Sequence, residues 1–141
     1  MNRRRFVAGA IAVAAGGAAS LAGAQDPRSS AAVSAARDWL LMTDHGDAAE
    51  SHKRAGVRFR NAMSVADWQV ALGRERTPRG AVEQRTLVQS AFPTSLPGVP
   101  EGEYALLEFR TSFAKQANAG ETLTLEREAD GTWRVVGYFI K

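Results

Sequence analysis

The chain has 141 residues, of which 18 are Lys or Arg, 15 are Asp or Glu and none is Cys. The absence of cysteine excludes a disulfide scaffold, a thiol enzyme, a zinc–thiolate site and a lipoprotein anchored through cysteine. Residues 1–24 contain three arginines and no acidic residue, so residues 25–141 carry 15 basic and 15 acidic residues. The net charge therefore gives no support for a nucleic-acid partner or an anionic membrane partner.

Residues 1–24 have the pattern of a secretory signal peptide. The positive cluster Arg3–Arg5 precedes an uncharged, Ala- and Gly-rich stretch, and Ala22–Ala24 fits the small-x-small cleavage pattern. A membrane anchor is the alternative, but this stretch has few large apolar residues. We expect cleavage between Ala24 and Gln25, no stable membrane anchor afterwards, and a periplasmic or secreted domain over residues 25–141.

The export route stays open. Arg3, Arg4 and Phe6 resemble the twin-arginine motif, and a weakly hydrophobic core is typical of that route. Asn2 stands where that motif prefers Ser or Thr. The sequence therefore allows either twin-arginine export or general secretion.

The first half of the exported part predicts helices. An apolar stripe runs through residues 31–44, and Gly46 stands where a helix normally stops. Asp47 has Glu50 three residues later, which predicts a short helix toward Ala55. Ser64, with Asp67 three residues later, predicts a third helix start. Between these helices the basic run at 53–60 is interpreted as a solvated face, and less favourably as a contact patch for an anion.

The second half has the period of strands. Residues 81–92 and 103–113 are strand-like, and the second run places five side chains on one face: Ala105, Leu107, Phe109, Thr111 and Phe113. The Pro- and Gly-rich stretch between them predicts a loop. Two further runs flank Asp130 and Gly131 and predict a hairpin. Helices followed by an antiparallel sheet indicate an α+β fold.

The register of this hairpin decides which residues face inward. A three-residue loop, 129–131, sets Glu126 opposite Arg134 and Leu125 opposite Val135, which is better electrostatically than a two-residue turn. It also places Glu121 opposite Phe139 on the face under the helices. Gly137 then lies opposite Leu123, where the missing side chain lets the sheet bend. We expect a curved sheet that forms a cone with the helices.

Several segments resemble one bacterial family, domain of unknown function 4019. They are ARDWLLMTDHGDAAES, the stretch 64–68, RTPRGAVEQR, GEYALLEF and ETLTLEREADGTWRVVGYFIK. The resemblance covers residues 36–141. It implies an exported bacterial protein with a cystatin-like or nuclear-transport-factor-2-like (NTF2-like) cone and no assigned activity.

Familiar catalytic and cofactor motifs do not appear in the sequence. His45 and His52 lie near acidic residues, but the helix break expected at Gly46 separates them, so we predict no metal site. There is no Gly-x-Ser-x-Gly elbow and no phosphate loop outside residues 1–24. We predict no cofactor.

The inside of the predicted cone holds the one candidate site. Glu121 faces inward there, and five aromatic residues are expected to line a pocket: Trp39, Trp68, Tyr104, Tyr138 and Phe139. A carboxylate in an apolar pocket has a raised pKa, which suits a general base. The competing interpretation is that Glu121 pairs with an arginine such as Arg85 and has a structural role.

We expect a non-catalytic binding or interaction module of the cell envelope. It would hold a small apolar ligand in the pocket, or form a homodimer through the outer sheet face, which comprises Thr122, Thr124, Val136, Tyr138 and Ile140. The alternative is an isomerase- or hydratase-like enzyme that uses Glu121, by analogy of fold alone.

Overall fold

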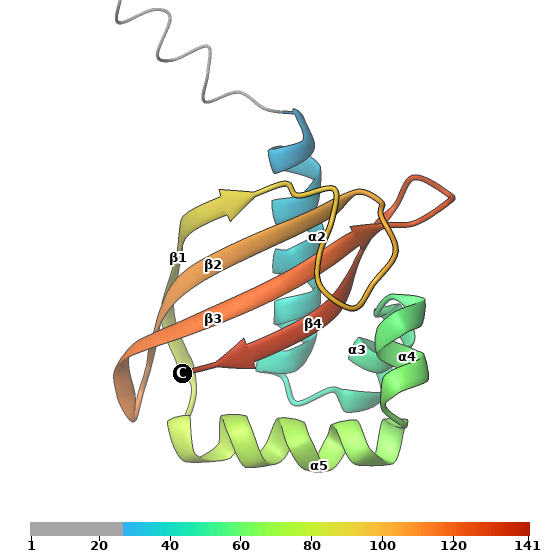
Figure 1. Cartoon of the computed structure of the whole chain (residues 1–141). Helices are drawn as coiled ribbons and strands as arrows, with labels where there is room; N and C mark the ends of the chain where they lie inside the picture. Colours follow the sequence, from blue (N-terminus) through green and yellow to red (C-terminus); the bar gives the residue numbers. More distant parts are fainter. Residues whose placement is uncertain (1–26) are drawn as a thin grey trace, which may run out of the picture. The chain divides into compact units, whose positions relative to one another are not determined.

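A computed structural model describes residues 27–141, and Ala31–Lys141 form one compact unit. The predicted signal and cleavage residues Arg3, Arg4, Phe6, Ala24 and Gln25 lie outside the described residues. The helices come before the strands (Figure 1), which confirms the α+β prediction. The elements are α2 (Pro27–Asp44), α3 (Ala48–Arg54), α4 (Val57–Ala62), α5 (Val65–Arg76), a 3-10 turn (Thr77–Arg79), β1 (Val82–Ala91), β2 (Tyr104–Phe113), β3 (Gln116–Arg127) and β4 (Trp133–Ile140).

Both predicted helix caps are present. The side chain of Asp47 accepts a hydrogen bond from the Glu50 backbone N–H at 3.0 Å and begins α3. The Ser64 hydroxyl accepts from the Asp67 backbone N–H at 3.1 Å and begins α5. Each cap satisfies an N–H that the first helical turn leaves without a partner.

Helix α4 was not predicted, because its sequence was interpreted as a basic solvated face. Gly56 is its N-cap, and Phe59 is buried in the core. The arginines around Phe59 are bound: Arg58 pairs with Glu126 at 2.9 Å, and Arg60 donates to the Ala55 carbonyl. A short helix that buries one aromatic side chain gives too weak a periodic pattern to be distinguished from a loop.

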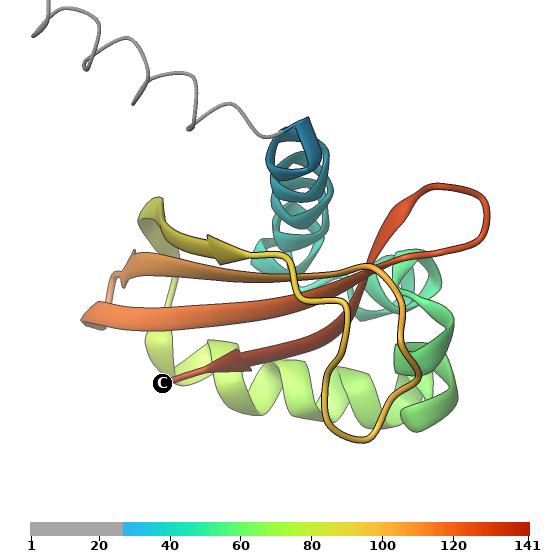
Figure 2. The same cartoon turned by 45° about the horizontal axis from the view of Figure 1, so that its top comes forward.

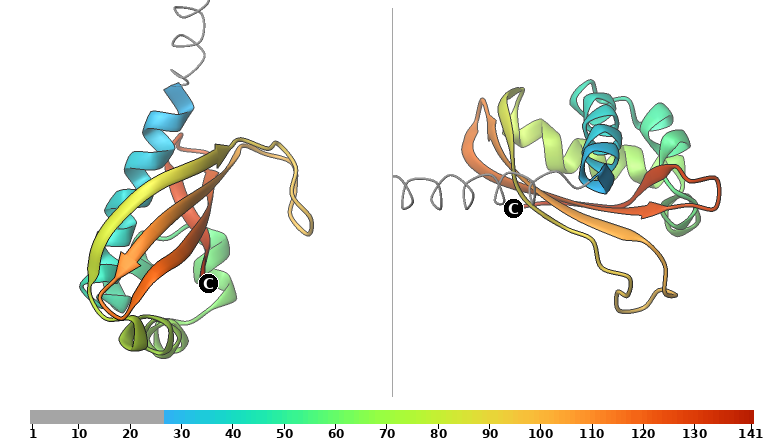
Figure 3. Two further views of the ribbon diagram at one scale, coloured as in Figure 1. Left: turned by 90° about the vertical axis from the view of Figure 1, so that its left-hand side faces the viewer. Right: turned by 90° about the horizontal axis from the view of Figure 1, so that it is seen from above.

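The four strands form one antiparallel sheet in the order β1-β2-β3-β4. Helix α2 runs along one face of it, and the loop between β1 and β2 lies on the other side (Figures 2 and 3). The strands are visibly bent (Figure 3). The inner face of β2 carries the five side chains predicted for it, all of which are buried. Ala105, Leu107 and Phe109 pack with α2 residues such as Ala36 and Leu40 in the main core, whereas Phe113 belongs to a second cluster with Ala119 and Ile140.

The predicted hairpin register is correct near the turn and wrong beyond it. Leu125 pairs with Val135 and Glu126 with Arg134, as expected. A β-bulge then shifts the register, so Thr124 pairs with Gly137 and leaves Val136 as the extra residue. Because side chains alternate along a strand, this one-residue shift turns the rest of β4 over.

The register shift changes the predicted cross-strand partners of Gly137 and Glu121. Gly137 lies opposite Thr124 instead of Leu123, and Glu121 lies opposite Ile140 instead of Phe139. Phe139 is 54% exposed, whereas Ile140 is buried and packs with Phe113. The predicted outer face therefore loses Tyr138 and Ile140 to the interior. No helix in the part of the chain that is described has the length and apolar character needed to cross a membrane.

Candidate functional site

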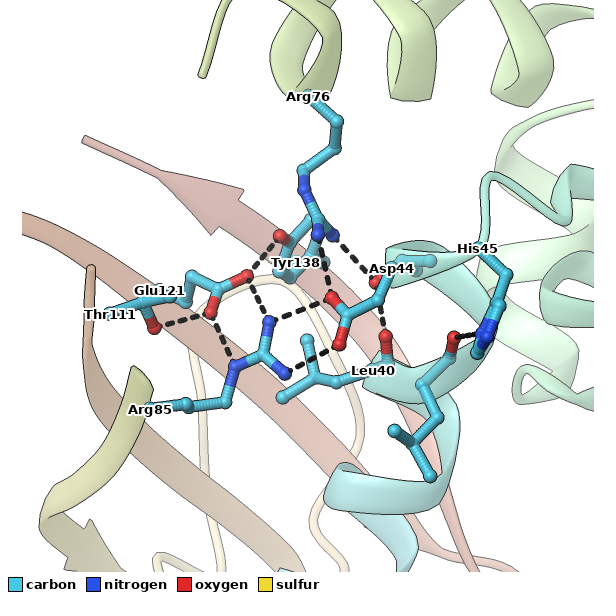
Figure 4. A network of polar contacts seen from close by, with 10 residues as sticks. Leu40, Asp44, His45, Arg76, Arg85, Thr111, Glu121 and Tyr138 are labelled. Carbon is cyan, nitrogen blue, oxygen red and sulfur yellow. Dashed lines mark hydrogen bonds and ion pairs between the residues drawn. The ribbon is translucent and has the colours of Figure 1, made fainter. Parts of the chain in front are cut away.

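Glu121 belongs to a buried network of polar contacts (Figure 4). Its side chain is 0% exposed, and both carboxylate oxygens are bound. Arg85 donates from Nε to Oε1 at 2.7 Å and from Nη2 to Oε2 at 3.3 Å. The hydroxyls of Thr111 and Tyr138 donate to Oε1 and Oε2, each at 2.5 Å. The arginine pairing that sequence analysis set against a catalytic role is thus present.

The sheet brings these groups together from all four strands, one from each. Arg85 pairs with Thr111 across β1 and β2, so both side chains point to the helix-covered face. Glu121 pairs with Phe109 across β2 and β3 and shares that face. Tyr138 joins them because the β4 bulge turns it inward.

The polar contacts continue into two helix C-termini. Asp44, the last residue of α2, accepts two hydrogen bonds from Arg85, each at 2.9 Å. Arg76, the last residue of α5, donates to Asp44 at 2.6 Å and to the Thr43 hydroxyl at 2.8 Å. We call Asp44, Arg76, Arg85 and Glu121 the charge cluster. It contains two acidic and two basic side chains, so their formal charges cancel.

The electrostatics of the charge cluster favour the ionised state of Asp44. Burial opposes the negative charge of Asp44, but hydrogen bonds and positive charge from Arg85 and Arg76 hold its pKa below the usual value. Burial, together with the negative charge and hydrogen bonding of Glu121, raises the pKa of Tyr138 far above that of a free tyrosine. Tyr138 is therefore a neutral hydrogen-bond donor at physiological pH.

Arg76 has one nitrogen without a partner. Its Nε is buried and has no hydrogen-bond acceptor among residues 27–141. The guanidinium lies 5.1 Å from the centre of the Phe113 ring, a cation–π distance that offsets part of the cost of burial. Through its hydrogen bonds, the charge cluster joins the C-terminal ends of α2 and α5 to β1 and β3.

An aromatic cluster lies next to these charges. The rings of Trp39 and Trp68 stack with centroids 5.7 Å apart, and Tyr138 contacts Trp39 edge-on at 5.3 Å. Ser51 fixes both indoles: its carbonyl accepts from Trp39 Nε1 and its hydroxyl accepts from Trp68 Nε1, both at 2.8 Å. Phe59 packs edge-on against both tryptophans. Three of the five predicted pocket residues, Trp39, Trp68 and Tyr138, therefore do come together.

The other two predicted pocket residues lie elsewhere. Tyr104 is next to inward-facing Ala105, so it points to the other side of the sheet, where its hydroxyl donates to the Pro100 carbonyl at 2.7 Å. Phe139 is exposed because of the bulge. Alternation along the strand, read from Ala105, already indicated the position of Tyr104.

A groove of about 270 Å³ opens beside the aromatic cluster, between α5 and β4. We call it the α5–β4 groove. Trp68 and Tyr138 line it from the aromatic cluster, and Phe139 lines it from β4. The remaining lining residues are Met63, Ala71, Leu72, Arg74, Glu75 and Ile140. This hollow is largely apolar and has one charge of each sign, and it is lined by three of the predicted pocket residues.

The two histidines are bound to backbone carbonyls. His45 Nδ1 is 2.7 Å from the Leu41 oxygen, and His52 Nε2 is 2.6 Å from the Met63 oxygen. Within residues 27–141, no group of three His, Asp or Glu side chains is placed to hold a metal ion.

Residues 35–138 match the model of a family described as a protein of unknown function, DUF4019. The chain belongs to this family. No curated protein and no solved structure matches it. The DUF4019 match spans α2 from Ala35 onward, all later helices and the sheet to Tyr138, so the charge cluster and the groove lie almost wholly inside it.

Sequence analysis identified Glu121 and Arg85 of the charge cluster in this DUF4019 domain but not the contributions of Asp44 and Arg76. The Thr43 hydroxyl, which accepts a hydrogen bond from Arg76, was not predicted either. The available clue was Arg85, which falls at an inward position of β1 between Val82 and Leu87. A charged residue at such a position requires a buried partner of opposite sign.

Proposed function

We propose that this chain is an exported binding module that holds a small apolar ligand in the α5–β4 groove. The observation that carries the proposal is the aromatic wall of the groove, where Trp68 and Tyr138 meet a Phe139 that is 54% exposed. An exposed aromatic side chain at the rim of an apolar hollow is typical of a surface that has a partner.

Binding is favoured over catalysis because of the state of Glu121. A general base must reach the proton that it removes. The carboxylate of Glu121 is instead occupied by Arg85, Thr111 and Tyr138 and is fully buried. An isomerase- or hydratase-like reaction would require these contacts to be broken, so we propose a structural role for this carboxylate.

The location is part of the proposal. The features of residues 1–24 support export to the periplasm or beyond, followed by cleavage after Ala24. The placement of helices on a bent four-stranded antiparallel sheet supports a relationship to bacterial cystatin-like or NTF2-like cones. Replacement of both Arg3 and Arg4 by Lys tests the route: export is blocked if the twin-arginine pathway is used, and undiminished export assigns the chain to general secretion.

The groove is tested with N-phenyl-1-naphthylamine, an uncharged apolar fluorescent probe. We expect saturable binding with one probe per chain and quenching of the emission of Trp68. Phe139→Ala should weaken binding roughly three- to tenfold, because part of the apolar contact is lost. Leu41→Ala is the matched control, since Leu41 is 55% exposed on α2 and does not line the groove.

Equal affinity of Phe139→Ala and Leu41→Ala, or the absence of saturable binding, would overturn the groove proposal.

Phe139→Ala also tests the second candidate, a homodimer through the outer sheet face. The exposed ring of Phe139, beside half-buried Thr122 and Thr124, is the observation that favours it. A clean monomer in size-exclusion chromatography at micromolar concentration would remove the dimer.

A further inference from the structure

A second hollow lies between α2, α3 and the start of β4 and shares no lining residue with the α5–β4 groove. We call it the α2–α3 cleft; its volume is about 380 Å³. Trp39, Trp133 and Val135 form its apolar floor and belong to the main core. Ala35 and Met42 of α2 add half-buried apolar surface. A core-anchored floor of this kind is pre-formed, so a ligand would not have to order it.

Four charged side chains line the cleft around this floor, and two of them have partners within the chain. Arg54 donates to Glu50 at 2.9 Å. Arg134 donates to Glu128 at 2.7 Å and to Asp130 at 2.8 Å and 3.0 Å. These two cations are therefore neutralised by acidic residues of the same chain.

Two charges at the cleft are left over. Lys53 and Asp38 are exposed, and within residues 27–141 neither has an ion pair or a side-chain hydrogen bond. Lys53 comes from α3 and Asp38 from α2, so an ammonium group and a carboxylate belong to different walls of one cleft. Because these two groups do not neutralise each other, the cleft offers one unpaired charge of each sign above an aromatic floor.

This pattern complements a particular class of ligand. We propose that the α2–α3 cleft binds a zwitterionic α-amino acid with an apolar side chain. Lys53 binds the ligand carboxylate, Asp38 binds its ammonium group, and the side chain lies against Trp39 and Trp133. The volume lies near the lower end for small-molecule sites, which suits one amino acid better than a segment of protein.

The test uses three ligands that share a phenylethyl group and differ in their charged groups. L-Phenylalanine carries both charges, 3-phenylpropionate only the carboxylate, and 2-phenylethylamine only the ammonium group. Binding is measured by titration calorimetry, and the site is located by backbone amide shifts in NMR. We expect L-phenylalanine to bind more tightly than either analogue and to shift residues 35–42, 53–54 and 132–135.

Two variants then separate the charges. Lys53→Met should weaken L-phenylalanine and 3-phenylpropionate about tenfold and leave 2-phenylethylamine unchanged, because a charge-assisted hydrogen bond is lost. Asp38→Asn should weaken L-phenylalanine and 2-phenylethylamine and leave 3-phenylpropionate unchanged. Lys115→Met is the matched control, because Lys115 is exposed in the β2–β3 turn and does not line the cleft.

Three results would overturn the assignment: no shift with L-phenylalanine at about 10 mM, equal affinities in the two variants and the control, or shifts confined to the α5–β4 groove. The two hollows have different probes and different variants. Failure of the amino-acid site therefore leaves the groove proposal to its own test, and the reverse also holds.

Discussion

Replacement of Arg85 by methionine gives the sharpest test of how this fold is held together. The guanidinium makes four hydrogen bonds to two carboxylates, and the Arg85 side chain is 9% exposed. Methionine keeps the apolar stem of the side chain and removes the charge. The variant leaves Glu121, whose side chain is 0% exposed, with two hydroxyl partners and no cation in direct contact.

Removal of one partner from a buried ion pair costs about 3–5 kcal/mol, because the other charge stays buried without compensation. Asp44 keeps Arg76 at 2.6 Å, so the loss falls mainly on Glu121. We expect the free energy of unfolding to fall by about 3–5 kcal/mol. For a domain of this size, that lowers Tm by roughly 10–20 °C.

The assay is urea unfolding followed by circular dichroism, with Arg127→Met as the matched control. Arg127 also pairs with a glutamate at 2.9 Å, but both side chains are nearly half exposed, so its loss should cost only a small fraction as much. Addition of Glu121→Gln to Arg85→Met should recover part of the stability, because the uncompensated charge is then gone. Similar losses for Arg85→Met and Arg127→Met, or no recovery in the double variant, would refute this account.

Four further predictions concern the pH dependence of stability and two glycines. The folded pKa of Asp44 is lowered, so its contribution to stability is complete above the unfolded pKa of about 3.9 and is lost as the pH falls through the folded value. In Asp44→Asn, the free energy of unfolding should therefore fall less steeply with decreasing pH in the acid range. An unchanged pH dependence in that range would contradict this. The folded pKa of Tyr138 is raised, so stability should decline above about pH 10 as the unfolded tyrosine ionises, and Tyr138→Phe should make that decline shallower. Gly73→Ala within α5 meets nothing within 4 Å and should stabilise by about 0.5–1 kcal/mol in thermal unfolding. Gly131→Ala should destabilise by about 1–2 kcal/mol in the same experiment, because φ is 81° there; equal signs for the two glycine variants would show that backbone conformation is not the cause.

The local parts of the structure followed from the sequence. Helix starts at Asp47 and Ser64 are set by residues three positions apart, which sequence displays directly. The inward face of β2 follows from simple alternation. The hairpin register near the turn follows from charge and packing of facing pairs such as Glu126 and Arg134.

The predictions that were wrong depended on contacts between segments that are far apart in the sequence. The bulge at Val136 shifts the register of β4 by one residue, and no local sequence pattern predicts it. This shift turns Tyr138 inward and Phe139 outward. The helix at Phe59 forms because its one buried ring packs against Trp39 and Trp68, residues from two other helices.

The sequence by itself determined the α+β order, the helix caps, the strand faces near the turn and the family to which the chain belongs. Only the tertiary structure decided the site. Asp44, Arg76, Arg85 and Glu121 come from four elements, and their contacts span 32 to 41 positions in the chain. Ion pairing depends on the distance between side chains in space and produces no periodic pattern in the sequence. The packing of α2 and α5 on the sheet therefore decides that Glu121, the candidate base, is a buried carboxylate with both oxygens bound.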